Sequence, residues 1–182
     1  MCKYIKTLIL TLILSMMICA QGMAKTVWSN DGRACFTTPD NWYLTSVGGD
    51  AATTELLTVA RDKDTCASLK RSNFALGVSS FRELSYAEKS EFRDNTIRNY
   101  CNYARSKGYD ITVGKTEIAD DVVFISYVMF KNGVRFLTIE TFVIKDYYCY
   151  SLSMIATDYT AQEAVQVCKS FRLDGMPLST KL

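Results

Sequence analysis

One group of side chains in the C-terminal half of the chain has the types and spacing to bind a ligand: Glu140 with the hydroxyls of Tyr127, Thr138, Ser151 and Ser153. A carboxylate within an otherwise apolar strand is costly to bury unless it is hydrogen-bonded or solvated. The four hydroxyls are suitable partners, and the small serines leave room for a cavity of the kind that binds small molecules. If the chain has a ligand-binding site, we predict that it lies here. The alternatives are a structural polar network or a sheet edge that faces water.

Catalytic chemistry is narrowly limited by composition, because the chain contains no histidine. Ser-His and Cys-His nucleophile pairs and His-ligated zinc are therefore excluded. Glu140 has no acidic neighbour on its strand face, and the charged segment 62–64 offers too few oxygens for calcium. We expect no catalytic residue, no metal and no cofactor. The sequence favours a non-catalytic binding or interaction module; the alternative is a His-independent hydrolase that uses carboxylate or Ser/Tyr chemistry.

The first 24 residues have the pattern of a secretory signal peptide. Lys3 and Lys6 precede an apolar run over 8–18, and Gly22-Met23-Ala24 supplies small residues at a cleavage site. The run is about half of the ~20 residues that span a bilayer, so a membrane anchor is the weaker alternative. We predict export to the periplasm or outside the cell, with no stable membrane insertion after cleavage, and a single domain over 25–182.

Charge and cysteine content bear on partners and compartment. The segment 1–24 contains two lysines and no acid, so the remaining chain has equal numbers of basic and acidic groups and offers no field for nucleic acid. The partner is thus an unknown protein or small molecule.

Export would place five cysteines in an oxidising compartment, and we expect a disulfide, assigned to Cys35 and Cys66 because both lie in polar strand-end segments. Lipid attachment at Cys19 is disfavoured by Ile18, where a small residue is expected.

Four consecutive strands must position the candidate site. We predict them over 109–118, 122–131, 134–144 and 147–157. Asn132-Gly133 is the strongest hairpin signal, and Asp120-Asp121 and Lys145-Asp146 supply the other tight turns, which together indicate an antiparallel meander. The resulting register places Tyr127 opposite Thr138 and Gly114, and Glu140 opposite Ile125 and Ser151.

Capping signals define two helices. Ser85 with Glu88, and Thr160 with Glu163, form capping boxes, and Gly108 and Gly175 follow as stop signals. Earlier in the chain we predict two short strands around a turn at 39–40, strands at 55–60 and 74–80, and a charged loop between them over 61–72.

The register also assigns faces to the meander. One face is wholly apolar, with residues such as Ile111, Phe124 and Leu152. The other mixes large apolar side chains with the candidate site, so something must cover part of it. We predict an α+β fold in which an antiparallel sheet is flanked by one helix on each side, an α/β/α sandwich.

This order of elements resembles the PsbP-like family, named for an accessory protein of the photosynthetic oxygen-evolving complex. The resemblance covers about 33–173 and rests on Pro39-Asp40-Asn41-Trp42 after the first strand and on Lys169-Ser170-Phe171-Arg172 at the closing helix. It implies the α/β/α sandwich and a non-enzymatic binding or assembly role, and it supplies no active-site motif.

Overall fold

The structure, a computed structural model, describes residues 24–45 and 48–177. The predicted signal peptide therefore lies almost wholly outside the described residues. Among those residues, no helix is both long enough and apolar enough to cross a membrane.

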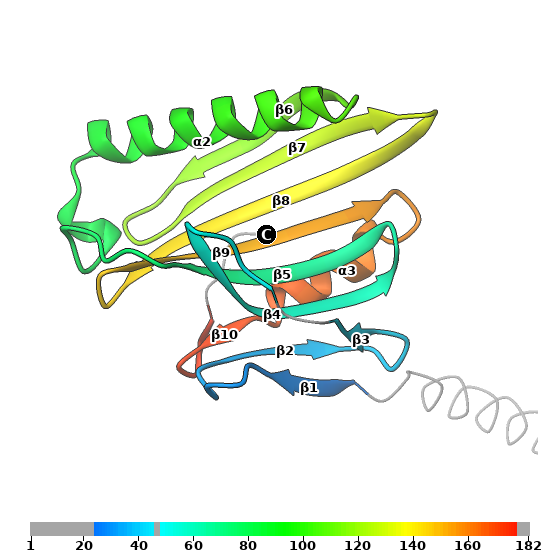
Figure 1. Cartoon of the computed structure of the whole chain (residues 1–182), viewed down its shortest axis with the longest axis horizontal. Helices are drawn as coiled ribbons and strands as arrows, with labels where there is room; N and C mark the ends of the chain where they lie inside the picture. The colour runs from blue at the N-terminus through cyan, green and yellow to red at the C-terminus, as the bar shows by residue number, and fades with distance from the viewer. Residues whose placement is uncertain (1–23, 46–47, 178–182) are drawn as a thin grey trace, which may run out of the picture.

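Seven antiparallel strands form the main sheet, in the order β3-β4-β5-β9-β8-β7-β6 (Figure 1). Its strands are β3 (Tyr43–Leu44), β4 (Thr53–Asp62), β5 (Thr65–Ser72), β6 (Asp110–Ile118), β7 (Val123–Lys131), β8 (Val134–Lys145) and β9 (Tyr148–Thr157). The last four are the predicted meander, with boundaries within one residue or so of the expected ones. The α+β fold class is thus confirmed.

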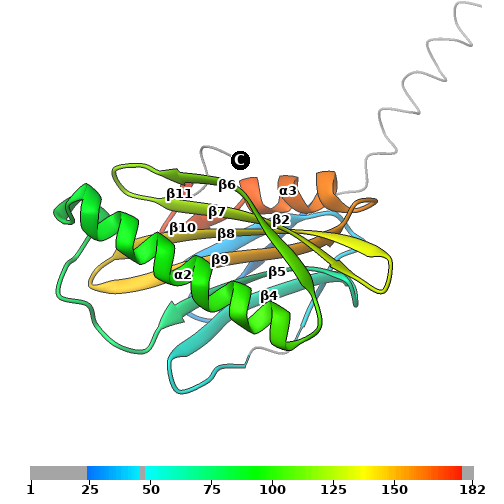
Figure 2. The same ribbon diagram turned by 90° about the horizontal axis from the view of Figure 1, so that it is seen from above.

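A smaller sheet joins the two ends of the described chain. It contains β1 (Lys25–Trp28), β2 (Ala34–Thr38), β10 (Arg172–Leu173) and β11 (Met176–Pro177), in the order β1-β2-β10-β11. The helices are the short 3₁₀ helix η1 (Phe81–Glu83), α2 (Tyr86–Ser106) and α3 (Ala161–Lys169). In both views α2 and α3 lie on different sides of the main sheet (Figures 1 and 2).

Each face of the main sheet packs against its own hydrophobic core. The core on the α3 side includes Trp42, Leu69, Leu152, Met154 and Phe171. The core on the α2 side includes Phe81, Cys101, Ile125, Tyr127 and Phe136. The mixed face of the meander is therefore the one that α2 covers, as the surplus of apolar groups on it required.

The N-terminus of α2 is capped as predicted. Ser85 Oγ accepts a hydrogen bond from the Glu88 backbone N–H at 3.3 Å, and Glu88 Oε2 accepts one from the Ser85 N–H at 2.8 Å. These bonds satisfy two backbone donors that the helix itself leaves unpaired.

Replacing Ser85 by alanine is expected to lower the free energy of unfolding by about 1 kcal/mol, because the first turn loses this acceptor. Urea denaturation measures the change. Glu91→Ala, at an exposed position inside the same helix, is the matched control and should stay within about 0.5 kcal/mol of the parent. Equal effects of the two substitutions would contradict the capping role.

The second predicted capping box does not form. Thr160 makes no side-chain bond to the first turn of α3. Its hydroxyl instead pairs with Thr65 Oγ1 at 2.7 Å, and Glu163 Oε1 accepts a hydrogen bond from Trp42 Nε1 at 2.6 Å. Thr160 is therefore bonded to β5 and Glu163 to the segment between β2 and β3, and neither side chain caps the helix.

The prediction for 61–80 was wrong. The segment expected to be a charged loop contains β5, and the segment expected to be a strand, 74–80, is irregular. Asp62 Oδ1 accepts from the Asp64 N–H at 2.8 Å, which makes a tight turn. Beyond it Thr65, Ala67 and Leu69 alternate into the α3-side core, a period-2 pattern that the intervening polar residues concealed.

The β8–β9 turn is one residue later than predicted. Asp146 and Tyr147 both have positive φ, 51° and 70°, so they are the two central residues, and Lys145 pairs with Tyr148. Every partner on β9 is thereby moved by two positions. A two-residue shift preserves the faces, so Glu140 lies opposite Ser153 instead of Ser151.

A β-bulge alters the β6–β7 register. From the turn back to Thr116, the residues of β6 and β7 pair as predicted. Beyond that point the register shifts by one residue, so that Val113, instead of Gly114, lies opposite Tyr127. Gly114 allows the bulge, because a Cβ there would lie 2.7 Å from Ser126 Oγ. The shift by one residue moves Ile111 to the α2-side core, whereas the expected face was the opposite one.

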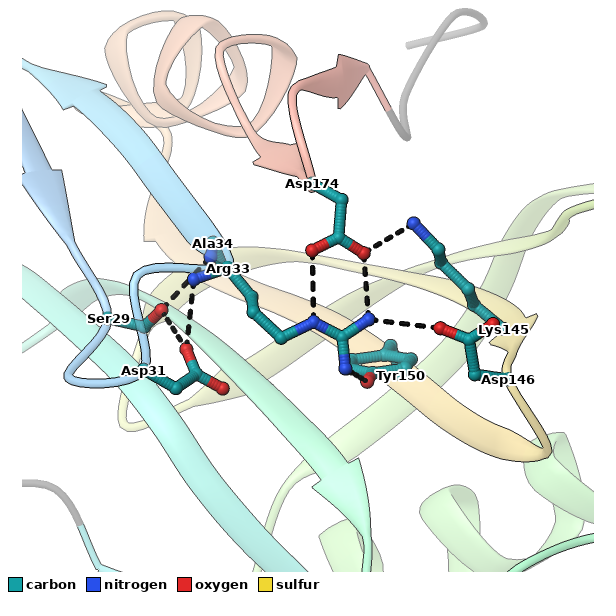
Figure 3. A network of polar contacts seen from close by, with 8 residues as sticks. All are labelled: Ser29, Asp31, Arg33, Ala34, Lys145, Asp146, Tyr150 and Asp174. Atoms are coloured by element: carbon teal, nitrogen blue, oxygen red, sulfur yellow. Dashed lines mark hydrogen bonds and ion pairs between the residues drawn. The ribbon is translucent and has the colours of Figure 1, made fainter.

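A charged network fastens the small sheet to the β8–β9 turn (Figure 3). Arg33 donates to both carboxylate oxygens of Asp174, at 2.9 and 2.7 Å, and also to Asp146 and to the Tyr150 hydroxyl. Lys145 donates to Asp174 as well. The Arg33 guanidinium and then the Lys145 ammonium hold the pKa of Asp174 well below its usual range. The network lies at the end of the sheet away from the α3 N-terminus and joins the segments before β2 and after β10 to the β8–β9 turn.

Candidate functional site

Glu140 occupies the middle of β8 on the α2 side and is only 9% exposed. The Tyr127 hydroxyl donates to Glu140 Oε2 at 3.4 Å, and Ser153 lies directly opposite on β9. Burial raises the pKa of Glu140 to about 7, while hydrogen bonds from Tyr127 and Ser153 and the charge of Lys70 act in the opposite direction. The carboxyl therefore holds its proton well above the pH at which a solvent-exposed glutamate releases it.

The structure brings three of the five predicted site residues into one network: Tyr127, Glu140 and Ser153. Thr138 pairs with Tyr127 across the strands and is buried, but its hydroxyl makes no hydrogen bond of normal geometry. Ser151 is opposite Phe142 and lies outside the network.

Tyr100 of α2 belongs to the site, although it was not among the predicted site residues. Its ring stacks on Tyr127 with centroids 4.5 Å apart and an interplanar angle of 28°. The stack holds the Tyr127 hydroxyl in place toward Glu140. The helical periodicity of 86–106 is a signal that places Tyr100 on the core-facing side, but it does not indicate which strand residue the ring contacts.

A row of polar side chains crosses the sheet from β4 to Glu140. Thr58, Ser68, Ser153 and Glu140 are successive cross-strand partners on β4, β5, β9 and β8. The hydroxyls of Thr58 and Ser68 share a hydrogen bond of 2.9 Å. Sequence reasoning missed the first half of this row because it assigned β5 to a loop.

Half of this sheet face is not covered by α2. The helix makes its main contacts with β6 and β7 and lies along that side of the sheet (Figure 1). On β5 and β9 the residues of the same face are only partly buried. We call this surface the open half-face; its members are Cys66, Ser68, Lys70, Ser151 and Ser153.

Two cavities are lined by described residues, and the second of them includes Tyr100 of the site. One of about 460 Å³ lies beside the β8–β9 turn, next to Lys145, Val143 and Met176. The other, of about 370 Å³, lies at the C-terminal end of α2. Neither cavity is lined by Glu140 or by its hydrogen-bond partners Tyr127 and Ser153.

All five described cysteines are free thiols, and the predicted Cys35–Cys66 bridge is not present. On β2 the neighbours Ala34 and Phe36 enter the α3-side core, as Ala67 does on β5. Because successive strand residues point to opposite faces, Cys35 and Cys66 point away from the core that their strands share. Burial raises the pKa of both thiols, and it raises the pKa of Cys149 and Cys168 to about 12, which disfavours a reactive thiolate at these four positions.

Comparison with known proteins bears on the fold. No family model matches the chain, and no curated protein matches its sequence. The solution structure of cyanobacterial PsbP (CyanoP) from Synechocystis sp. PCC 6803 superposes with a TM-score of 0.56 at 12% identity, covering 85% of this chain and 95% of that one. The chain has a PsbP-like fold.

The resemblance seen in the sequence is thus confirmed at the level of the fold. A crystal structure from Bacteroides thetaiotaomicron VPI-5482 aligns with a TM-score of 0.48 at 13% identity, over 84% of this chain and 48% of that one.

The two aromatic residues of the sequence motifs, Trp42 and Phe171, are 1% and 0% exposed within the α3-side core. They therefore serve the fold and not the site.

Proposed function

We propose that the chain is an exported, non-catalytic binding or interaction module, a periplasmic accessory protein or secreted effector, whose contact surface is the open half-face. The observation that carries the proposal is the position of Glu140. Its hydrogen-bonded carboxyl, whose pKa burial raises to about 7, lies where the sheet passes from the half covered by α2 to the half that is open.

The open half-face suits a protein partner better than an enclosed small molecule. It presents the hydroxyls of Ser68, Ser151 and Ser153 and the ammonium of Lys70 on a sheet surface that neither cavity includes. Hydroxyls both donate and accept hydrogen bonds, so the face can pair with the polar groups of a surface laid across it. The PsbP-like fold, a fold of accessory proteins, supports the same class of function.

No observation favours the hydrolase alternative. The groups that act on the pKa of Glu140 are burial, Tyr127, Ser153 and Lys70, and no second carboxyl is among them. Acid-base hydrolysis by carboxylates needs two that converge on one substrate.

Export is proposed from the pattern in 1–24. Cleavage after Ala24 would leave every described strand and helix intact, because β1 begins at Lys25. Cell fractionation with N-terminal sequencing of the extracytoplasmic material tests it. A product beginning at Lys25 supports the proposal; an uncleaved or lipidated chain contradicts it.

Site-specific photo-crosslinking in cells tests the contact surface. Benzoylphenylalanine in place of Ser68 or Ser151 is expected to give one discrete cross-linked species. The same residue at Glu91 or Asn99, exposed on α2, is the control and should not give that species. Equal yields from both sets, or none from the open half-face, would refute the assignment.

A further inference from the structure

The cavity at the C-terminal end of α2 has a chemical character that the proposed function does not use. Its volume is about 370 Å³, within the range of small-molecule sites. Three tyrosines line it: Tyr100 and Tyr103 belong to α2, and Tyr109 is the residue immediately before β6. Met129 of β7 also lines it. Ala104 and Ile155 complete the uncharged part of the lining, so the walls combine aromatic and aliphatic side chains.

Part of this wall is held rigidly before any ligand arrives. Tyr100 is fixed by its stack on Tyr127, and its hydroxyl reaches Met129 Sδ at 3.9 Å. Tyr109 meets Phe136 edge to face with centroids 5.9 Å apart. Side chains that are already ordered lose little entropy when a ligand binds, so a preformed aromatic wall lowers the cost of binding. Tyr103, which is 61% exposed, forms the solvent side.

Two ammonium groups give the cavity its charge. Lys131 Nζ lies 4.6 Å from the Tyr109 ring centroid and donates to the Lys107 carbonyl at 2.8 Å. Lys107 Nζ lies 5.6 Å from the Tyr103 ring centroid. No acidic side chain is among the described residues that line the cavity. Each ammonium has three donors, so both retain hydrogen-bonding capacity for a ligand.

We propose that this cavity binds a small aromatic anion. A planar ring lies against the tyrosines, and its carboxylate or sulfonate pairs with Lys107 and Lys131. Ring stacking and a charge-assisted hydrogen bond act together in this arrangement. None of the residues that line the cavity belongs to the open half-face, although Ile155 in its wall is the cross-strand partner of Cys66. Binding of a small anion is therefore measured independently of the proposed partner surface.

Titration with 1-naphthalenesulfonate, followed by amide chemical shifts and by its fluorescence, tests the proposal. Saturable binding with shifts at Tyr100, Lys107 and Lys131 is expected. The neutral analogue 1-naphthalenemethanol should bind about tenfold more weakly, because it lacks the charge-assisted bond. No saturation by the sulfonate at millimolar concentration, or shifts confined to other surfaces, would overturn the proposal.

Variants separate the charged and aromatic contributions. The double variant Lys107→Gln and Lys131→Gln should weaken sulfonate binding about tenfold or more and leave binding of the neutral analogue unchanged. Tyr103→Ala should weaken both probes. Lys63→Gln, at an exposed turn, and Tyr159→Ala, at a residue 99% exposed, are the matched controls and should change neither. Sulfonate affinity that is the same in the lysine variant and its control would overturn the assignment.

Discussion

Replacing Glu140 by glutamine is expected to stabilise the protein at pH 8 by roughly 3 kcal/mol relative to the parent chain, and by much less at pH 4.5. The unfolded chain releases this proton near its ordinary pKa, about 4.3. The folded chain keeps it until about pH 7, because the carboxyl is buried on β8. Between these values the folded state binds more protons, so the free energy of unfolding of the parent falls as the pH rises. Glutamine cannot ionise and avoids that loss.

Urea denaturation of parent and variant at several pH values between 4.5 and 8 measures the effect. The difference in the free energy of unfolding should grow across this interval and level off above pH 7. Using the difference removes the contributions of other titrating groups, such as Asp174. Glu91→Gln, on the exposed side of α2, should follow the pH profile of the parent. A constant difference between Glu140→Gln and the parent would show that Glu140 is not held protonated.

Replacing Trp42 by alanine should cost about 3–5 kcal/mol of stability, the range for deleting a fully buried aromatic. The side chain is 1% exposed in the α3-side core and its Nε1 donates to Glu163 Oε1 at 2.6 Å. The indole therefore joins the segment after β2 to α3. Its loss leaves a cavity and removes one partner of Glu163, which keeps Arg61 at 3.5 Å.

Two further variants divide this effect. Trp42→Phe keeps most of the apolar contact and loses the indole N–H, so it should cost less than the alanine substitution. Trp28→Ala is the control, because Trp28 on β1 is 56% exposed, and it should cost under about 1 kcal/mol. Thermal and urea unfolding give the ranking. A larger loss for Trp28→Ala than for Trp42→Ala would refute the placement of Trp42 in the core.

Local sequence signals accounted for the elements whose causes are local. Asn132-Gly133 tolerates the positive φ of a two-residue hairpin, and both residues have it, 52° and 77°. The Ser85–Glu88 cap is formed within a single helical turn. The β7–β8 register followed from the turn alone, and it correctly placed Glu140 opposite Ile125 and on the same face as Tyr127.

Other elements were decided by contacts between distant residues. The spacing of Thr160 and Glu163 predicted a capping box. In the folded protein Thr65 and Trp42, which are distant in the sequence, bond these two side chains instead. The bulge beside Gly114 depends on Ser126 of the neighbouring strand, whose hydroxyl bonds the Lys115 backbone. A pattern read along one strand contains no information about such a partner.

The candidate site shows the same division. Sequence alternation together with the register set by the Asn132-Gly133 turn determined that Glu140 and Tyr127 share a face, because the side-chain period and a two-residue turn are both local properties. Only the tertiary structure decided that Ser153 is the opposite partner, that Tyr100 stacks on Tyr127, and that the face is half open. Those outcomes depend on where the β8–β9 turn forms and on which strands α2 covers. Both are set by packing between segments far apart in the chain, which no local pattern encodes.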